Sequence, residues 1–224
     1  MILAAGRGER MRPLTDYTPK PLLPVGDKPL IAWHLERLAA AGFTEVVINH
    51  AHLGEQIEAA LGDGSAYGLR IAYSAEPPGA LETAGGIAKA LALLGDAPFL
   101  VINGDIYCDW NPAAARSALG ADDEAHLVLV PNPEHHSNGD FKLDENRVFD
   151  EGTPRRTFAG IGVYRPALFA EIEVGQPAKL APLLRAAMRQ GRVSGELHQG
   201  RWVDVGTPLR LAELDDELSS EAQP

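Results

Sequence analysis

The chain has 224 residues, a length typical of one large α/β domain and short for two. Its net charge of −11 argues against nucleic acid or an anionic membrane surface as the main partner. The single cysteine, Cys108, excludes an internal disulfide and fits a reducing cytoplasm, and no apolar run reaches membrane-spanning length. We therefore expect a cytoplasmic protein with a local pocket for an anionic small molecule.

The chain opens with a short apolar run that predicts a buried strand stopping at Gly6. Because this strand is very short, the sequence leaves open whether residues are missing ahead of Met1. Gly6 and Gly8 let the backbone bend and present its N–H groups to an anion. Full positive charge surrounds this turn at four positions, Arg7, Arg10, Arg12 and Lys20. The arrangement favours a polyphosphate ligand, with a plain flexible turn as the alternative.

Strands and helices then alternate along the first half of the chain. The expected strands lie at 45–49, 69–74 and 99–102. The expected helices lie at 29–42, with Asp27 as a candidate cap, at 54–61, and at 83–95, with Thr83 as the cap. Alternation at this spacing implies right-handed β-α-β crossovers and a mainly parallel sheet.

The second half of the chain is less regular. We expect strands at 125–130 and 157–164, a hairpin at 140–149, a pair of strands at 193–197 and 201–205, and helices at 180–188 and 208–218. No internal repeat and no low-complexity linker is visible. The expected fold class is α/β, with three layers around a mainly parallel (mixed) sheet. One domain would span residues 1–218, followed by an acidic tail at 219–224.

Two aspartates follow predicted strands and are candidate ligands of Mg²⁺. Asp105 comes after the strand at 99–102, and Asp204 ends a strand about a hundred residues later. Ligands of open α/β sheets bind beyond the carboxyl ends of the strands, and Mg²⁺ prefers oxygen ligands that it shares with substrate phosphates. The structural alternatives are a turn residue at Asp105 and a helix cap at Asp204.

The N-terminal string as a whole resembles the nucleotidyltransferase family that makes NDP-sugars from sugar 1-phosphates. The elements of the match are Leu3-Ala4-Ala5-Gly6-Arg7-Gly8-Glu9-Arg10-Met11-Arg12-Pro13-Leu14-Thr15, Pro19-Lys20-Pro21, Pro24-Val25 and Lys28-Pro29. No P-loop ending and no third glycine of a dinucleotide fingerprint is present. The resemblance implies a Rossmann-like nucleotidyltransferase fold over the whole domain.

The resemblance also implies roles for individual residues. It makes Arg10 and Lys20 catalytic, and it places magnesium on Asp105 and Asp204. It implies nucleotide contacts at Leu3, Ala4, Ala5, Gly6, Gly8, Glu9, Arg10, Lys20, Glu76, Gly85 and Asn103. It implies sugar contacts at Asp140, Glu151 and Thr207. The chain departs from the family before the strand at 157–164, where Arg155 or Arg156 stands in for a lysine near the sugar phosphate.

The activity that the resemblance implies is Mg²⁺-dependent transfer of a nucleotidyl group from an NTP, with UTP favoured, to a sugar 1-phosphate. The short form and the strings 47–51, 81–83, 103–105 and 139–141 favour N-acetylmuramate 1-phosphate, as in bacterial cell-wall recycling. Guanylyl or thymidylyl transfer to mannose, heptose or glucose 1-phosphate stays open, as does a non-catalytic relative that binds a nucleotide sugar. The oligomeric state cannot be inferred from the sequence.

The histidines and the cysteine, which could in principle bind a metal or act as nucleophiles, are interpreted as residues without a catalytic role. His50, His52, His135 and His136 lack the spacing of a metal site, and we expect them on the surface or in loops. Cys108 is expected to be a packed thiol rather than a nucleophile.

Overall fold

The computed structural model describes residues 1–77, 79 and 81–221. Contacts within the chain divide it into two compact units, and each is described by itself. The parallel-sheet unit comprises Ile2–Ala80, Asn103–Pro112 and Arg201–Pro224. The mixed-sheet unit comprises Met1, Leu81–Ile102 and Ala113–Gly200. None of the described helices is long and apolar enough to cross a membrane.

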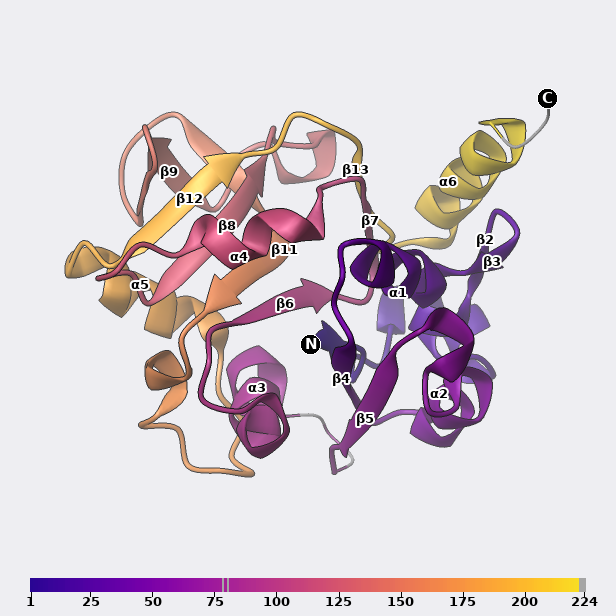
Figure 1. Ribbon diagram of the computed structural model, residues 1–224. Coiled ribbons are helices and arrows are strands. Elements are labelled where there is room, and N and C mark those ends of the chain that lie inside the picture. Colours follow the sequence, from indigo (N-terminus) through magenta and orange to yellow (C-terminus); the bar gives the residue numbers. More distant parts are fainter. Residues whose placement is uncertain (78, 80, 222–224) are drawn as a thin grey trace. The chain divides into compact units, whose positions relative to one another are not determined.

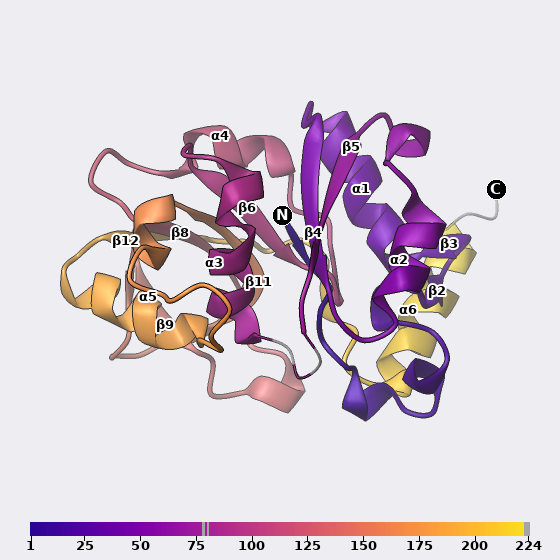
Figure 2. The same ribbon diagram turned by 90° about the horizontal axis from the view of Figure 1, so that it is seen from below.

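Three parallel strands form the sheet of the parallel-sheet unit, in the order β5 (Arg70–Ala75), β4 (Glu45–His50) and β1 (Ile2–Leu3). The two helices α1 (Leu30–Ala40) and α2 (Gly54–Leu61) connect these strands and lie on the same side of β4 and β5 (Figure 2). Parallel strands joined by helices place all their carboxyl ends along one edge of the sheet. The loop after β1 begins at this edge.

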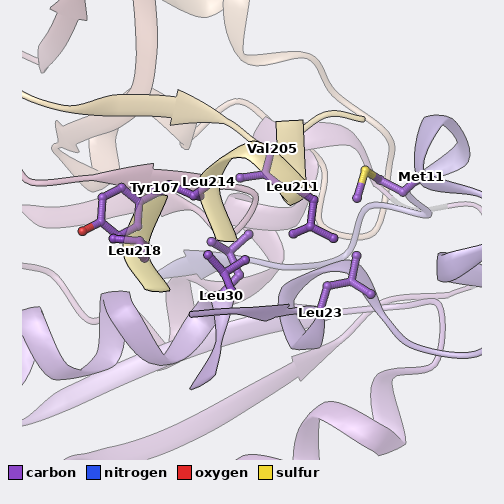
Figure 3. Packing of buried hydrophobic residues seen from close by; sticks show 9 residues of the cluster. Met11, Leu23, Leu30, Tyr107, Val205, Leu211, Leu214 and Leu218 are labelled. Atoms are coloured by element: carbon purple, nitrogen blue, oxygen red, sulfur yellow. The ribbon is translucent and has the colours of Figure 1, made fainter. Parts of the chain in front are cut away.

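Two short antiparallel pairs complete the same unit. Strand β2 (Pro24–Val25) pairs with β3 (Lys28–Pro29), and β7 (Ile106–Cys108) pairs with β13 (Trp202–Asp204). Helix α6 (Pro208–Glu221) follows β13 and packs against β2. Figure 3 shows the resulting apolar cluster, in which side chains from distant segments meet: Met11, Leu23, Val25, Leu30, Tyr107, Val205, Leu211, Leu214 and Leu218. The N-terminal and C-terminal segments therefore share one core.

The mixed-sheet unit contains six strands in the order β6, β11, β8, β12, β10, β9 (Figure 1). Their bounds are Phe99–Asn103, Arg155–Tyr164, Ala125–Val130, Val193–Leu197, Arg147–Phe149 and Phe141–Asp144. Only β8 and β12 run parallel among these pairs; β11 runs antiparallel to β6 and β8. Helices α3 (Glu82–Leu94), α4 (Ala115–Ala118) and α5 (Leu180–Arg189) belong to this unit, and Phe99, Tyr164 and Phe169 pack as an aromatic group.

The predicted fold class, α/β with a mixed sheet, is confirmed. Helix α2 and strand β8 have the predicted bounds, and the hairpin at 140–149 forms as β9 and β10. The pairs β1–β4, β4–β5 and β8–β12 are parallel, whereas β9–β10 and β8–β11 are antiparallel, because hairpins and long returns dominate the second half.

Three local predictions are wrong. The strands at 193–197 and 201–205 do not pair with each other, because β12 pairs with β8 and β13 with β7. Helix α3 has Leu81 rather than Thr83 at its cap, and Glu82 adopts a left-handed φ of 59°. Pro29 rather than Asp27 precedes α1. Helix α6 also continues to Glu221, so the expected tail is helical at 219–221, and 222–224 lie outside the described residues.

Candidate functional site

The glycine turn after β1 is folded tightly onto Thr15. Gly8 has a left-handed φ of 69°, and a Cβ added there would lie 2.9 Å from Thr15 Cγ2. The Gly8 carbonyl accepts hydrogen bonds from the Thr15 hydroxyl at 2.8 Å and from the Met11 N–H at 2.9 Å. A residue with a side chain at position 8 would be strained in both its backbone and its contacts. The turn therefore has a fixed shape before any ligand binds.

Two of the arginines around this turn are part of its own structure. The Arg7 guanidinium donates to Asp16 Oδ1 at 2.9 Å and to the Thr15 carbonyl at 2.8 Å. Arg12 Nε donates to the same Asp16 oxygen at 2.8 Å. These hydrogen bonds, from Arg12 first and then Arg7, lower the pKa of Asp16. Arg7 and Arg12 thus neutralise a carboxylate of the loop.

Arg10 differs from both neighbours. Its side chain is exposed, and it forms no hydrogen bond or ion pair with any residue in the described ranges. Glu9, which was predicted to contact the nucleotide, is exposed and lies 3.4 Å from Arg12 Nη1 and 3.8 Å from Arg7 Nε. Of the arginines in the turn, Arg10 is the one whose charge is available to a ligand.

Lys20 and Asp105 form an ion pair beside the turn. Lys20 is 7% exposed, and its Nζ lies 2.7 Å from Asp105 Oδ2. Asp105 reaches this position because the Gly104 N–H donates to the Leu3 carbonyl at 2.8 Å. A Cβ at Gly104 would lie 2.7 Å from that carbonyl oxygen, so glycine permits the close approach. The predicted residues Asn103, Gly104 and Asp105 therefore lie against the end of β1.

Asp204 lies on the strand next to Asp105. The Val205 N–H donates to the Asp105 carbonyl at 3.0 Å, and Asp204 pairs with Ile106 across β13 and β7. The buried Val205 packs into the apolar cluster, which leaves the Asp204 carboxylate to bind Arg210, whose Nη1 donates to Oδ2 at 2.8 Å. Asp105 lies in the turn just before β7, and Asp204 ends β13, the strand that pairs with β7. Each carboxylate accepts a bond from a cation.

Gly206 lies where three charged groups meet. A Cβ added there would lie 3.0 Å from Asp204 Oδ1, 3.0 Å from Arg10 Nη2 and 2.6 Å from Arg210 Nη2. Arg10, from the glycine turn, and the Asp204 carboxylate therefore have Gly206 as a common neighbour. Lys20, in turn, binds Asp105 on the adjacent strand.

Thr207 was predicted to contact the sugar, and it caps helix α6. Its hydroxyl accepts hydrogen bonds from the Arg210 backbone N–H at 3.3 Å and from Arg210 Nε at 3.4 Å. Its carbonyl accepts the Leu211 N–H at 3.1 Å. Thr207 therefore anchors both the start of the helix and the side chain that binds Asp204.

A second network joins the carboxyl ends of β1, β4 and β5. Asn49 Oδ1 accepts the Ala4 N–H at 2.9 Å, and Asn49 Nδ2 donates to Glu76 Oε1 at 2.6 Å. Asn49 and Glu76 are buried, and the Glu76 N–H donates to the His50 carbonyl at 2.7 Å. Glu76, predicted to contact the base, is engaged here in holding the loop that begins at Ala4.

The predicted sugar residues Asp140 and Glu151 and the predicted base residue Gly85 belong to the mixed-sheet unit. The Asp140 carboxylate accepts the Phe158 N–H at 2.8 Å, and its other oxygen lies 3.1 Å from His136 Nε2. Glu151 is exposed. The Gly85 N–H donates to the Ala178 carbonyl at 3.1 Å.

The two candidate replacements for the family's lysine differ in their contacts. Arg155 Nη2 donates to the Asp140 carbonyl, and Arg155 Nε is buried without a hydrogen-bond partner. The Arg156 side chain forms no hydrogen bond or ion pair with a described residue. Of the two, Arg156 is the cation that is free to bind an anion.

The structure confirms the prediction for Cys108 and contradicts the one for His50. Burial raises the pKa of the Cys108 thiol to about 11, so the predicted packed thiol is confirmed. His50 is wrong as a surface histidine, because it is 6% exposed and its Nε2 lies 2.7 Å from Glu58 Oε1. His52 Nε2 lies 2.8 Å from the Thr15 carbonyl, which suits a donor that stabilises the glycine turn.

The sequence interpretation assigned no role to Arg210 or Asn49. Arg210 follows Asp204 by six residues across a Gly-Thr-Pro turn, a spacing that no helical or strand period predicts. Asn49 ends an expected strand next to the loop edge, so its position could have marked it.

Comparison with known proteins extends these observations. A sequence model described as nucleotidyl transferase matches residues 1–221. The chain is 63% identical to an N-acetylmuramate alpha-1-phosphate uridylyltransferase of Neisseria meningitidis, over 95% of each chain. It is 38% identical to a protein of the same name from Caulobacter vibrioides, over 93% of this chain and 91% of that one.

The same fold is present in a solved structure from Bacillus anthracis described as a glucose-1-phosphate thymidylyltransferase. The TM-score is 0.85 with 22% identity, and the alignment covers 97% of this chain and 94% of the other. At this identity the likeness shows the fold alone. It confirms the predicted nucleotidyltransferase architecture.

Proposed function

Because the chain belongs to the nucleotidyl transferase family, we propose that it transfers a uridylyl group from UTP to N-acetylmuramate 1-phosphate and releases pyrophosphate. The observation that carries the proposal is the pairing of Lys20 with Asp105 at 2.7 Å beside a preformed glycine turn. The two relatives named for this reaction match the chain almost from end to end. The activity in their names supports the choice of base and sugar.

The reaction needs charge stabilisation more than proton transfer. The second pKa of a phosphate monoester is about 6, so the attacking oxygen of the sugar phosphate is largely deprotonated at neutral pH. That oxygen forms a bond to the α-phosphorus of UTP, while the bond from this phosphorus to the bridging oxygen breaks and pyrophosphate leaves. The chain must therefore bring two polyanions together and stabilise the negative charge of the transferring group.

The residues of the parallel-sheet unit suit this task. The backbone N–H groups around Gly6 and Gly8 would hold the phosphates, and the unpartnered Arg10 would bind the phosphate oxygens. Lys20 would add a second charge from a buried, fixed position. Preorganised cations of this kind cost no reorganisation during the reaction.

Asp105 and Asp204 are suited to hold Mg²⁺. They offer carboxylate oxygens, the ligands this ion prefers, and the hydrogen bond from the Val205 N–H to the Asp105 carbonyl joins their two segments. When bound there, the ion would neutralise the phosphates and orient the in-line displacement.

In the mixed-sheet unit, Arg156 is the candidate for the acceptor. The lactyl group of muramate adds a carboxylate that the 1-phosphates of glucose, mannose and N-acetylglucosamine lack. Arg156 carries a charge that no described residue neutralises, whereas Arg155 is bound to the Asp140 carbonyl. Arg156 would therefore select the acidic sugar.

A pyrophosphate-release assay over a matrix of substrates tests the proposal. UTP, GTP, dTTP and ATP are each combined with the 1-phosphates of N-acetylmuramate, N-acetylglucosamine, mannose and glucose, with and without Mg²⁺. We expect release from UTP with N-acetylmuramate 1-phosphate, and only when Mg²⁺ is present. Pyrophosphate release confined to another base or sugar would replace the proposed substrates. No pyrophosphate release from any combination would favour a protein that binds nucleotide sugars without turnover.

A further inference from the structure

Each carboxylate proposed to hold the metal already accepts a bond from a cation of this chain. Lys20 Nζ lies 2.7 Å from Asp105 Oδ2, and Arg210 Nη1 lies 2.8 Å from Asp204 Oδ2. Lys20 has a place in the proposed reaction, and Arg210 has none so far. The Asp204–Arg210 pair is largely protected from solvent, because the side chains are 23% and 17% exposed. Its attraction is therefore screened less than that of a surface pair.

The position of Arg210 is unfavourable unless Asp204 is present. Arg210 lies in the first turn of α6, where the helix dipole disfavours a positive charge. Asp204 supplies the compensating negative charge, and the Thr207 hydroxyl accepts from Arg210 Nε at 3.4 Å. The helix start thus holds the guanidinium against the carboxylate.

The surroundings of Asp204 carry more positive than negative charge. Arg10 Nη2, Arg210 Nη2 and Asp204 Oδ1 all lie next to Gly206, at 3.0, 2.6 and 3.0 Å from the place of an added Cβ. The Arg210 guanidinium binds the Asp204 carboxylate, and the Arg10 guanidinium lies next to the same glycine. Such a group repels a free divalent cation and attracts an anion.

We propose that Arg210 is the resident counter-ion of Asp204 and keeps free divalent cations off this carboxylate while no nucleotide is bound. The inference rests on the proposed function, because it takes Asp204 as a magnesium ligand. A triphosphate would offer both arginines other anionic oxygens and would bring further ligands for the ion. The metal is then expected to bind together with the nucleotide and only weakly before it.

A titration with Mn²⁺ followed by electron paramagnetic resonance tests this, with the nucleotide-free full-length chain and Mn²⁺ as the probe. We expect Arg210→Gln to bind Mn²⁺ about tenfold more tightly than the wild type, because a positive charge next to the ligand is removed. Arg210→Lys keeps the charge and should bind as the wild type does. Equal or weaker binding by Arg210→Gln would overturn the proposal and leave Arg210 as a residue that only orients Asp204.

Arg201→Gln is the matched control. It removes the same charge from the same unit, where Arg201 also binds α6 through Glu217 and Glu221. It should leave Mn²⁺ binding unchanged, and a gain equal to that of Arg210→Gln would make the effect one of net charge and overturn the proposal.

A second variant keeps the test decisive if Arg210→Gln does not fold. With Arg210 already on the carboxylate, Asp204→Asn should weaken Mn²⁺ binding to the nucleotide-free protein less than about threefold, and a loss of tenfold or more would overturn the proposal. Neither titration contains a substrate. A result that contradicts this proposal can therefore be distinguished from a lack of activity in the pyrophosphate-release assay, which would contradict the proposed function.

Discussion

At the scale of single residues, the structure separates arginines that the sequence presents as equivalent. Arg7 and Arg12 bind Asp16, whereas Arg10 has no described partner. A charge that a neighbouring carboxylate already neutralises contributes little to binding a phosphate. The contacts therefore identify which cation of the turn is available for chemistry.

Arg10→Ala should lower turnover by about two to three orders of magnitude, as expected for removal of a preorganised charge donor. Arg12→Ala is the control, since it removes an exposed arginine two positions away and should change turnover less than about threefold. Steady-state pyrophosphate release measures both. Near wild-type turnover of Arg10→Ala would remove Arg10 from the mechanism.

The sequence predicted much of this site because its motifs are local strings. Lys20 and Asp105 were expected near one ligand and lie 2.7 Å apart. Arg210 was missed, because its contact with Asp204 depends on how the Gly206–Thr207 turn leads into α6. The roles of Glu76, Asp140 and Thr207 in holding the backbone also depend on contacts that no motif encodes.

At the scale of elements, α6 connects the segment of Asp204 to the apolar cluster. Leu211, Leu214 and Leu218 repeat at helical spacing and are buried, whereas Leu209 on the same helix is 68% exposed. The helix thereby fixes the position of Arg210 at its start. The packing of its leucines thereby supports the site.

Leu214→Ala should lower the free energy of unfolding by about 2–5 kcal/mol, because it removes a fully packed side chain and leaves a cavity. Leu209→Ala, on the exposed face, should change it by less than about 0.5 kcal/mol. Urea unfolding followed by circular dichroism compares the two. Equal effects would show that α6 does not depend on this face.

Helix α1 is joined to β7 by a buried histidine. His34 Nε2 donates to the Ile106 carbonyl at 2.8 Å, so the neutral ring carries its proton on this nitrogen. Burial lowers the pKa of His34 to about 4 from its ordinary value of 6.5. Between these two values the unfolded chain binds a proton that the folded chain does not. Stability should therefore fall as the pH drops from about 6.5 toward 4.

The expected loss over this range is about 2–4 kcal/mol from His34. His34→Gln keeps a donor for the Ile106 carbonyl and removes the titration, so its unfolding free energy should depend less on pH. Urea unfolding at pH 7.5 and pH 5 measures the difference, with the exposed His135→Gln as the control. The same pH dependence in His34→Gln and the wild type would contradict this assignment.

The success of sequence prediction also differs between elements. Helix α2 and strand β8 have their predicted bounds because their signals, a glycine at each end of α2 and a continuous apolar run in β8, are local. The partners of β12 and β13 could not be predicted, because strand pairing is decided by contacts between distant segments. The cap of α3 was missed because a left-handed Glu82 has no sequence signature.

At the scale of the whole molecule, neither unit is a continuous stretch of chain. One apolar cluster of the parallel-sheet unit combines side chains from 11–30, Tyr107 and 205–218, so this cluster cannot form until helix α6 has been made. A fragment of residues 2–80 lacks Tyr107, Val205 and the three leucines of α6. The unit is therefore built from segments that are distant in the sequence.

We expect the fragment 2–80 to show no cooperative urea transition, whereas the full chain unfolds cooperatively under the same conditions. The stabilising free energy lost with five side chains of one apolar cluster exceeds the net stability of an ordinary small domain. A sigmoidal transition of the fragment would show that the N-terminal segment folds without its C-terminal partner.

The hydrogen bonds from Ala4 to Asn49 and from Asn49 to Glu76 have a consequence for motion. The Asn49 side-chain amide is hydrogen-bonded both to the main chain after β1, at Ala4, and to the segment after β5, at Glu76. A shift of one segment should therefore be coupled to a shift of the other. Ordering of either segment by a bound molecule would be transmitted to the other. Slowed hydrogen exchange at Ala4 and at Glu76 should then arise in the same step, as a single cooperative event.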